Sequence, residues 1–579
     1  MTFESNTSDL TGTAGTRPAA ARRRGLSRLA VIGTAAALAV GALTATAHAT
    51  ATPAAHPLPG GGHVHTAPQV AAPKLDLGKL ATGKAKRNVA TSSGWVIPSD
   101  LVYQGYSGTV DIEGNDQPGG FTRIQPSGTQ QYRQVLDIGD VNGDNADDIL
   151  TITGSGHLQL VYGNGQGAIA LGGGWQIYNQ VTVAGDINGD GRADLIARDT
   201  AGRLWYYASN NATGTTASFA GRKQVGTSWN IYDQVVGVSH FDSANASLVA
   251  RDLQGKLWLY DAKADGTFGA RKQIGTSWNI YNQIVSIDAN ADGHSDLVGR
   301  TLAGALKVYT SNGAGGTSTA VQIGTGYYGI NVLGDQGTAA AWGKGGIEGR
   351  QSNGNLRWYG SYGNGRVAAG QADGTGWVPG TIPVLTEANS LNDNGTSDLV
   401  VVNKWGDFWN VNNGSDSPLV IGSSYNKVVG PGDLNSDGKS DLIARDKAGK
   451  LWFIPGTGTG FIYNRVSLGA GWNIYNRIIG SGDLTNDGIP DLMATTPAGA
   501  MYIYPGKGNG GFGARILVGT GWQGYNKLAA PGDLTGDGKG EVVGVDSAGR
   551  LWEYPGLGHA NFGARVEIGT SWNSFTDIG

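Results

Sequence analysis

A unit of about 50 residues that recurs along the chain constrains the fold more than any other feature. An acidic loop begins at Asp433 and returns at Asp483 and Asp533, so these neighbouring loops are 50 residues apart. Other clear copies begin at Asp140, Asp186 and Asp288, and degenerate copies lie near Ser239, Asp335 and Ser390. Nine copies of one unit predict a protein built from stacked repeats rather than from one irregular core.

Each unit contains four short apolar segments. In the copy at Asp433 they occupy residues 426–430, 441–445, 450–454 and 464–469, separated by Gly, Asp or a Pro-Gly pair. Segments of this length, rich in β-branched and aromatic residues, are typical of β-strands. Four strands per unit, repeated many times, predict the blades of a β-propeller, and the 98 glycines suit an all-β fold with many tight turns. An open β-solenoid and a string of small β-sandwiches are the alternatives.

The two ends of the repeat region look like parts of one unit. Residues 569–579 resemble the start of a first strand, as in 275–288, whereas residues 99–128 resemble strands two to four without a first strand. We therefore expect the C-terminal strand, around 576–578, to complete the first blade and remove its open edge. This predicts one ring of ten units over residues 93–579. Two smaller rings are the alternative, because the units from 324 to 383 match poorly and could hide a boundary.

The acidic loops carry side-chain oxygens at positions 1, 3, 5 and 9, and position 6 is usually Gly. Hard oxygen ligands at alternate positions of a tight loop predict a Ca²⁺ site, and the variable position 7 suits a backbone carbonyl ligand. A strand follows the loop and no Glu stands at position 12, so it is not an EF-hand. A purely polar turn is the alternative for any single loop. Six loops with one spacing favour the cation, and Mg²⁺ fits less well because it keeps its water.

We thus expect about six Ca²⁺ sites. Their predicted ligands are Asp140, Asn142, Asp144 and Asp148; Asp186, Asn188, Asp190 and Asp194; Asp288, Asn290, Asp292 and Asp296; Asp433, Asn435, Asp437 and Asp441; Asp483, Thr485, Asp487 and Asp491; and Asp533, Thr535, Asp537 and Glu541. The copy at Ser390 offers at best a weak site, and the copy at Ser239 is expected to be metal-free.

The D-x-N-x-D-G-x-x-D-L pattern between two strands, in units of about 50 residues, resembles the FG-GAP or VCBS repeats of integrin-α-like propellers. The resemblance covers roughly residues 95–579 and implies a calcium-binding propeller of the secreted bacterial type. A second, shorter stretch, GTSWNIYNQIV and its copies, is similar to the tachylectin-type sugar-binding propellers, although those lectins lack the acidic loops. The ligand-binding residues that this second likeness suggests are Trp229, Asn230, Tyr232, Trp278, Asn279, Tyr281, Trp472, Asn473 and Tyr475. The alternative is that these Trp and Tyr rings only pack neighbouring blades together.

The N-terminus carries an export signal. Three arginines at 22–24 precede an apolar run over 29–43 and a small-x-small sequence at 47–49, which predicts a signal peptide over 1–49. A single N-terminal anchor is the alternative, and the choice between general and twin-arginine export stays open. Residues 50–92, rich in Ala, Pro and Gly, are expected to form a flexible leader. The chain is then secreted, has no membrane span after cleavage, and lacks cysteine for disulfides.

The composition excludes some classes of function. The 42 basic and 46 acidic residues give no electrostatic footprint for nucleic acid. We find no catalytic constellation, so the chain is not expected to be an enzyme. The sequence predicts a secreted, calcium-stabilised and non-catalytic binding module for glycans of a cell wall or chitin-like polysaccharide. A surface scaffold that binds an extracellular protein, and a polysaccharide-degrading enzyme on a propeller, are the alternatives; the oligomeric state is open.

Overall fold

The computed structural model describes residues 55–56, 58, 63, 65, 67–68, 73–80, 100–105, 109–114, 122–124, 131–139, 141, 147–163, 167–210, 218–290, 292–334, 344–411, 416–420 and 422–579. The predicted signal peptide at 1–49 lies outside these residues. The helical turns that the structure describes are too short to cross a membrane. They are η1 (Leu77–Leu80), η2 (Trp175–Ile177), η3 (Trp229–Ile231), η4 (Trp278–Ile280), η5 (Tyr327–Gly329), η7 (Trp472–Ile474), η8 (Trp522–Gly524) and η9 (Trp572–Ser574).

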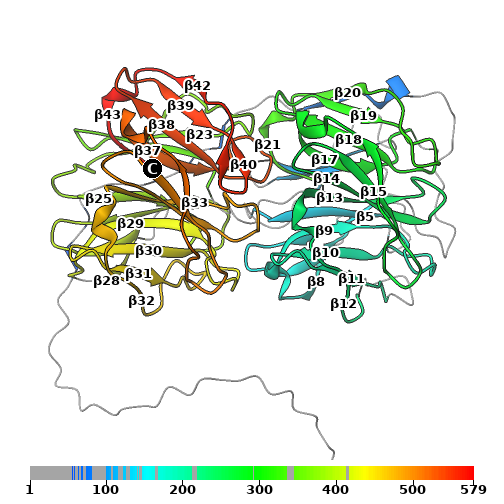
Figure 1. The fold of residues 1–579 in the computed structure, drawn as a ribbon, viewed down its shortest axis with the longest axis horizontal. Helices are drawn as coiled ribbons and strands as arrows, with labels where there is room; N and C mark the ends of the chain where they lie inside the picture. The colour runs from blue at the N-terminus through cyan, green and yellow to red at the C-terminus, as the bar shows by residue number, and fades with distance from the viewer. Residues whose placement is uncertain are drawn as a thin grey trace, which may run out of the picture. The chain divides into compact units, whose positions relative to one another are not determined.

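The strands form antiparallel four-stranded sheets, as predicted, and the first five sheets make one ring (Figure 1). Blade one is β21 (Ile330–Leu333), β2 (Asp100–Gly105), β3 (Val110–Gly114) and β4 (Thr122–Ile124). Blade two is β5 (Gln134–Gly139), β6 (Asp148–Ile152), β7 (Leu158–Val161) and β8 (Ala168–Gly172). Blade three is β9 (Tyr178–Val183), β10 (Leu195–Asp199), β11 (Leu204–Tyr207) and β12 (Lys223–Gly226). Blade four is β13 (Tyr232–Ser239), β14 (Ala246–Asp252), β15 (Leu257–Asp261) and β16 (Lys272–Gly275). Blade five is β17 (Tyr281–Ile287), β18 (Asp296–Thr301), β19 (Leu306–Tyr309) and β20 (Val321–Thr325).

The next five sheets make a second ring. Blade six is β43 (Phe575–Ile578), β22 (Gly346–Gln351), β23 (Leu356–Gly360) and β24 (Gln371–Gly374). Blade seven is β25 (Val384–Ala388), β26 (Asp398–Val402), β27 (Phe408–Val411) and β28 (Ser417–Val420). Blade eight is β29 (Tyr425–Gly432), β30 (Asp441–Asp446), β31 (Leu451–Ile454) and β32 (Val466–Gly469). Blade nine is β33 (Arg477–Gly482), β34 (Asp491–Thr495), β35 (Met501–Tyr504) and β36 (Ile516–Gly519). Blade ten is β37 (Tyr525–Gly532), β38 (Glu541–Asp546), β39 (Leu551–Tyr554) and β42 (Val566–Gly569), with a small hairpin of β40 (Gly556–Gly558) and β41 (Asn561–Phe562).

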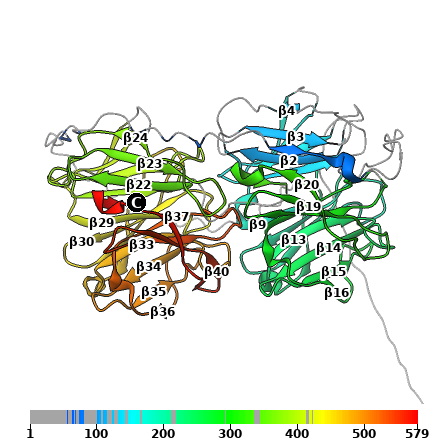
Figure 2. The same ribbon diagram turned by 90° about the horizontal axis from the view of Figure 1, so that it is seen from above.

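The way the rings close corrects one prediction. The C-terminal strand β43 pairs with β22, through Gly349↔Ile578 and Arg350↔Asp577, and the C-terminus lies beside β22 in Figure 2. The first blade instead takes its missing strand from β21, through Tyr103↔Leu333. The predicted ten units and the β-propeller fold are confirmed, but the single ring closed by the C-terminus is wrong. The alternative of two smaller propellers is correct.

The closing strand of the first ring departs from the residue pattern of the repeat. The other clear copies have Trp followed three residues later by Tyr, whereas here Tyr327 and Ile330 stand at those positions. Both residues are still buried, at 0% and 2% exposure, and pack in a cluster with Leu101 and Tyr103 of the first blade. These two positions therefore remain buried in the core although their residue types differ from those of the other copies.

The core of each ring lies between its blades. A cluster of Ile479, Met493 and Trp522 with Val542, for example, joins blade nine to blade ten, and equivalent clusters occupy the other seams. Arginines on second strands also cross the seams: Arg445 donates from Nη1 to the carbonyl of Tyr475 at 2.8 Å. Because a single four-stranded sheet cannot bury both of its faces, this blade-on-blade contact supplies most of the apolar burial.

The described residues before β2 are not free of the propellers, which differs from the expected flexible leader. The short strand β1 (Lys74–Leu75) pairs with β20, through Lys74↔Thr325. His63 is 4% exposed, and His56 stacks on Trp405 with ring centroids 4.4 Å apart. Part of the segment that composition assigned to a leader therefore packs against folded blades.

Candidate functional site

The acidic loops link the first and second strands of their blades. Some grow from an irregular strand end: the β29–β30 pairing shifts register between Val429 and Gly432, and β37–β38 does so between Ala529 and Gly532. Position 6 needs a left-handed backbone, which Gly438 supplies with φ of 87°. The strand pair therefore holds the loop in one fixed turn, and the last acidic residue starts the second strand.

Backbone N–H groups hold the carboxylates at positions 1 and 9. In the loop between β29 and β30, Asp433 accepts bonds from the N–H groups of Asp437 at 3.1 Å and Gly438 at 2.8 Å. Asp441 at position 9 accepts bonds from the N–H groups of Leu434 and Gly456, each at 2.9 Å. The same backbone N–H groups donate to carboxylates in the loops at Asp186, Asp288, Asp483 and Asp533.

Acidic oxygens converge most closely in the loop of blade ten. Oxygens of Asp533, Asp537 and Glu541 all lie within 4.8 Å of one another, and it is the one acidic loop in the described ranges where three carboxylates meet this closely. Asp533 is 7% exposed and Glu541 is fully buried. Lys539 offsets part of the charge, since its ammonium lies 3.0 Å from Asp537. Carboxylate oxygens at such distances are the ligands that Ca²⁺ prefers, so the donor set fits the predicted ion.

The electrostatics of the loops also fit a cation. Burial, with the charges of Asp292 and Asp288, raises the pKa of Asp296 to about 8. Burial, with the charges of Asp433 and Asp437, likewise raises the pKa of Asp441 to about 8. In the loop of Asp483, burial and the charge of Asp487 raise its pKa to about 7. Buried carboxylates that repel one another favour the protonated form unless a cation offsets their charge.

The remaining predicted loops divide into two groups. Asp140, Asn142 and Asp144 lie outside the described residues, although Asp148 of the same loop is buried and accepts a 2.9 Å bond from the Val141 N–H. The degenerate loops fold without the full acidic set. At Ser390 the hydroxyl accepts the bond from the Gly395 N–H at 3.1 Å, in the place where the other loops have a carboxylate. Calcium at the acidic loops stays a prediction that these contacts accommodate.

The predicted ligand-binding aromatics lie at the seams between blades. The turns η3, η4 and η7 carry them, and the rings of Trp229 and Trp278 are 7% and 6% exposed. Trp229 packs against Tyr260 with centroids 4.5 Å apart. The three tyrosines Tyr232, Tyr281 and Tyr475 are buried, Trp472 is half-buried, and the three asparagines Asn230, Asn279 and Asn473 are exposed. These rings therefore serve blade packing, and a ligand role for them stays a prediction.

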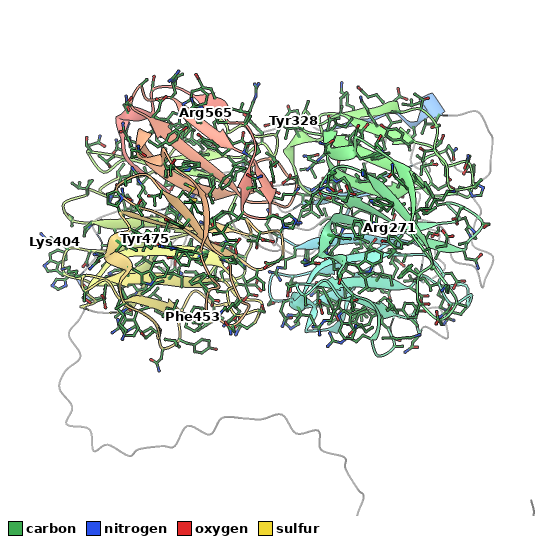
Figure 3. All side chains as sticks on the ribbon, viewed as in Figure 1. Arg271, Tyr328, Lys404, Phe453, Tyr475 and Arg565 are labelled. Atoms are coloured by element: carbon green, nitrogen blue, oxygen red, sulfur yellow. The ribbon has the colours of Figure 1, made fainter. Side chains whose placement is uncertain are left out.

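The structure adds an arginine that the sequence reasoning missed. Arg565 donates from Nη1 to the Tyr525 hydroxyl at 2.6 Å, and its guanidinium lies over the Trp552 ring at 4.1 Å (Figure 3 labels Arg565). Arg271 makes the same bond to Tyr232 at 2.8 Å and covers Trp258. The signal was present in the sequence, because a Phe-Gly-Ala-Arg stretch ends at Arg271, Arg515 and Arg565.

A hollow of about 440 Å³ opens at the seam before blade ten. Its aromatic lining includes Trp522, Tyr525, Tyr554 and Phe562, and its polar lining includes Asp546, Asn561 and Arg565. Hydrogen bonds from the Trp552 indole and from Arg550 lower the pKa of Asp546 to about 2, so this carboxylate is ionised at neutral pH. A hollow lined by aromatic side chains together with a few polar groups is typical of a small-ligand site.

Comparison with known proteins supports the repeat type. Residues 140–197, 433–494 and 483–544 match the FG-GAP-like repeat, so the predicted repeats are confirmed in a β-propeller fold. No curated protein matches the sequence at a significant level.

Two lectins are among the similar solved structures. One, from Agrocybe aegerita, is described as recognising non-reducing terminal N-acetylglucosamine; it is 16% identical with a TM-score of 0.25 over 83% of this chain and 92% of that one. The other, from Burkholderia pseudomallei, is 14% identical with a TM-score of 0.25 over 68% of this chain and 99% of that one. At these values neither likeness says what this chain binds.

Proposed function

We propose that this chain is a secreted, non-catalytic binding module that takes a glycan into the seam hollow before blade ten. The hollow lined by Trp522, Asn561 and Arg565 carries the proposal. An apolar C–H face of a sugar would stack on the edge of the aromatic floor, while Asn561, Arg565 and Asp546 offer hydrogen bonds to hydroxyl groups. Calcium in the acidic loops stabilises the blades that shape the hollow.

Repetition of the seam supports a polymeric ligand. Tyrosine hydroxyls pair at several seams, as in Tyr475 with Tyr504 at 2.5 Å, and Arg515 caps this pair just as Arg565 caps Tyr525 (Figure 3 labels Tyr475). Weak sites repeated around a ring gain avidity when the ligand itself is repetitive. We therefore assign the ligand to a cell-wall or chitin-like polysaccharide.

Binding of polysaccharides in calcium buffer tests this function. We expect the wild-type chain to be retained on an insoluble N-acetylglucosamine polymer, and soluble oligomers to compete for it. Asn561→Ala should weaken binding of a soluble oligomer by about two- to tenfold, the range for one lost hydrogen bond, with melting unchanged. Asn573→Ala is the matched control, since Asn573 is an exposed asparagine outside the hollow.

The outcomes distinguish an error in the assigned site from an error in the proposed function. Loss of binding in Asn561→Ala but not in Asn573→Ala supports the hollow as the site. Equal binding by both variants moves the site elsewhere and overturns the assignment. Absence of wild-type retention on every polysaccharide of a cell-wall and chitin panel overturns the glycan function itself.

A further inference from the structure

Four metal-ligating side chains meet in the second ring, and none of them belongs to the six acidic loops or to the seam hollow. His63 and His65 come from the segment before β1, Glu348 lies on β22 and Glu387 on β25. One ligand atom from each residue lies within 4.8 Å of all the others. His65 Nε2 is 3.7 Å from Glu387 and 4.0 Å from Glu348, and His63 Nε2 is 3.8 Å from Glu387.

These ligand atoms are buried and lack hydrogen bonds of ordinary geometry. The side chains of His63, Glu348 and Glu387 are each under 5% exposed, and that of His65 is 8% exposed. Among the described residues, both Nε2 atoms and all four carboxylate oxygens have no hydrogen-bond partner. Buried polar atoms are almost always satisfied in native proteins, and an isolated buried charge is costly. Six such atoms facing one another point to a missing partner rather than to poor packing.

The histidines are held so that Nε2 faces the carboxylates. His63 Nδ1 bonds to the Asp373 carboxylate at 2.5 Å, and His65 Nδ1 bonds to the Ser397 hydroxyl at 2.8 Å. His65 also stacks on Trp358, with centroids 3.5 Å apart and planes 13° apart. A carboxylate or hydroxyl on one ring nitrogen fixes the tautomer and orients the other nitrogen toward a metal.

Direct hydrogen bonding does not explain the cluster. The nitrogen–oxygen distances of 3.7–4.0 Å are too long for hydrogen bonds. Lys344 is the nearby ammonium, but it donates to the carbonyls of Gly480 and Ala530 at 3.0 and 3.3 Å. Glu348 and Glu387 are both buried, so two neighbouring carboxylates share a site in which negative charge is costly. A divalent cation between them would remove that conflict.

We propose that His63, His65, Glu348 and Glu387 bind a divalent transition-metal ion, for which Zn²⁺ is the best match. One ligand atom from each of the four residues lies within 4.8 Å of the others, so the side chains would have to draw together to reach zinc–ligand distances of about 2.0–2.2 Å. Two imidazoles argue against Ca²⁺ and Mg²⁺, which prefer oxygen ligands alone. Four buried protein ligands leave no open position, which is the form of a structural zinc site.

The ion would tie the segment before the first ring to the second ring. His63 lies 285 residues before Glu348 in the sequence and is a neighbour in the fold. His56 strengthens the same attachment through a 2.8 Å contact with Asp407. A chain without cysteine thereby acquires a cross-link comparable to a disulfide. This inference is independent of glycan binding and of calcium in the acidic loops.

The metal content of the untagged, secreted chain tests the proposal. After equilibration with Zn²⁺ and then dialysis in calcium buffer, we expect one zinc per chain by mass spectrometry of the elements. His63→Gln and Glu387→Gln should lose it, while the control His56→Gln, in the same segment but outside the cluster, keeps it. Asp373→Asn should retain the site with about 10- to 100-fold weaker affinity, because Asp373 orients a ligand without being one.

Two further measurements guard against misfolding and against adventitious zinc. Co²⁺ in place of zinc should give the intense visible bands of a tetrahedral site in wild type and in His56→Gln only. A zinc-selective chelator, with calcium kept in excess, should speed proteolytic cleavage around 55–68 while both rings stay intact. The proposal is overturned if folded wild type holds no more zinc or cobalt than a folded His63→Gln, Glu387→Gln double variant.

Discussion

Removing the last strand should unfold the second ring and spare the first. Deletion of 572–579 takes away Trp572 and Phe575, which are 4% and 5% exposed and pack with Ile347 and Val543. Truncating a buried aromatic side chain costs about 3–5 kcal/mol, so the side chains of Trp572 and Phe575 together contribute about 6–10 kcal/mol to stability. That is comparable to the whole stability of an ordinary domain, about 5–15 kcal/mol. The deletion also leaves β22 as an unpaired edge.

Calorimetry and limited proteolysis in calcium buffer would measure this effect. We expect one melting transition to fall or vanish, and protease to degrade residues 344–571 while a fragment around 100–334 persists. The reciprocal variant Leu333→Ala should weaken the first ring by about 2–5 kcal/mol, because Leu333 is fully buried where β21 closes that ring. If the deletion instead exposes 100–124 to protease first, the C-terminus closes the first blade and the two-ring reasoning fails.

Four further predictions concern the loops and the seams. Chelation of calcium should lower the melting temperature strongly, because a site with a dissociation constant near 0.1 mM adds about 1.4 kcal/mol at 1 mM Ca²⁺; an unchanged melting curve in excess chelator, with metal loss confirmed, would contradict it. In that calcium-free state, stability should fall as pH rises from about 4 to about 8, since Asp296 and Asp441 have a pKa raised to about 8 in the fold and bind protons that the unfolded chain releases; denaturant titrations at pH 5 and pH 8 measure this. The double variant Asp433→Ser, Asp437→Asn, which copies Ser390 and Asn394, should fold but lose one calcium by equilibrium dialysis; retention of that calcium would show that these carboxylates are not ligands. Trp278→Ala should cost about 3–5 kcal/mol because its ring is 6% exposed, whereas exposed Asn279→Ala should change unfolding free energy by under about 0.5 kcal/mol; equal losses would refute the packing role.

The strands and the blades could be predicted from the sequence because each unit repeats the same local signals. Apolar strand residues such as Val428, Leu442 and Leu451 return at equivalent positions in the other units. Each copy therefore strengthens the prediction of a strand at that position. Ring closure was harder to predict from the sequence, because it depends on pairing between strands that are far apart in the chain. The closing segment around Tyr327 and Ile330 is still apolar but lacks the residue types of the repeat. The sequence pattern therefore does not mark the boundary between the two rings.

The candidate sites differ in the same way: those made by a local sequence pattern could be predicted, and those assembled by the fold could not. The acidic loops are local, so their residues could be named from spacing alone. The zinc cluster draws on His63, His65, Glu348 and Glu387, which no local pattern connects. One signal was available: His63 and His65 alternate, which in an extended segment places both side chains on one side. Their partners on β22 and β25 become visible only when the blades are built.

The degenerate loops show which part of an acidic loop the turn itself requires. In the Ser390 copy, Ser390 replaces the first carboxylate and still accepts the Gly395 N–H, while Asp398 accepts the Leu391 N–H at 2.8 Å. With the amide oxygens of Asn392 and Asn394, which accept the N–H groups of Asn394 and Thr396, this turn is held with a carboxylate at position 9 alone. The carboxylates at positions 1 and 5 of the other loops also accept backbone N–H groups, but they add negative charge that repels their neighbours and that the neutral side chains of the Ser390 copy lack. We propose that calcium binding accounts for their presence, since a bound cation turns that repulsion into coordination.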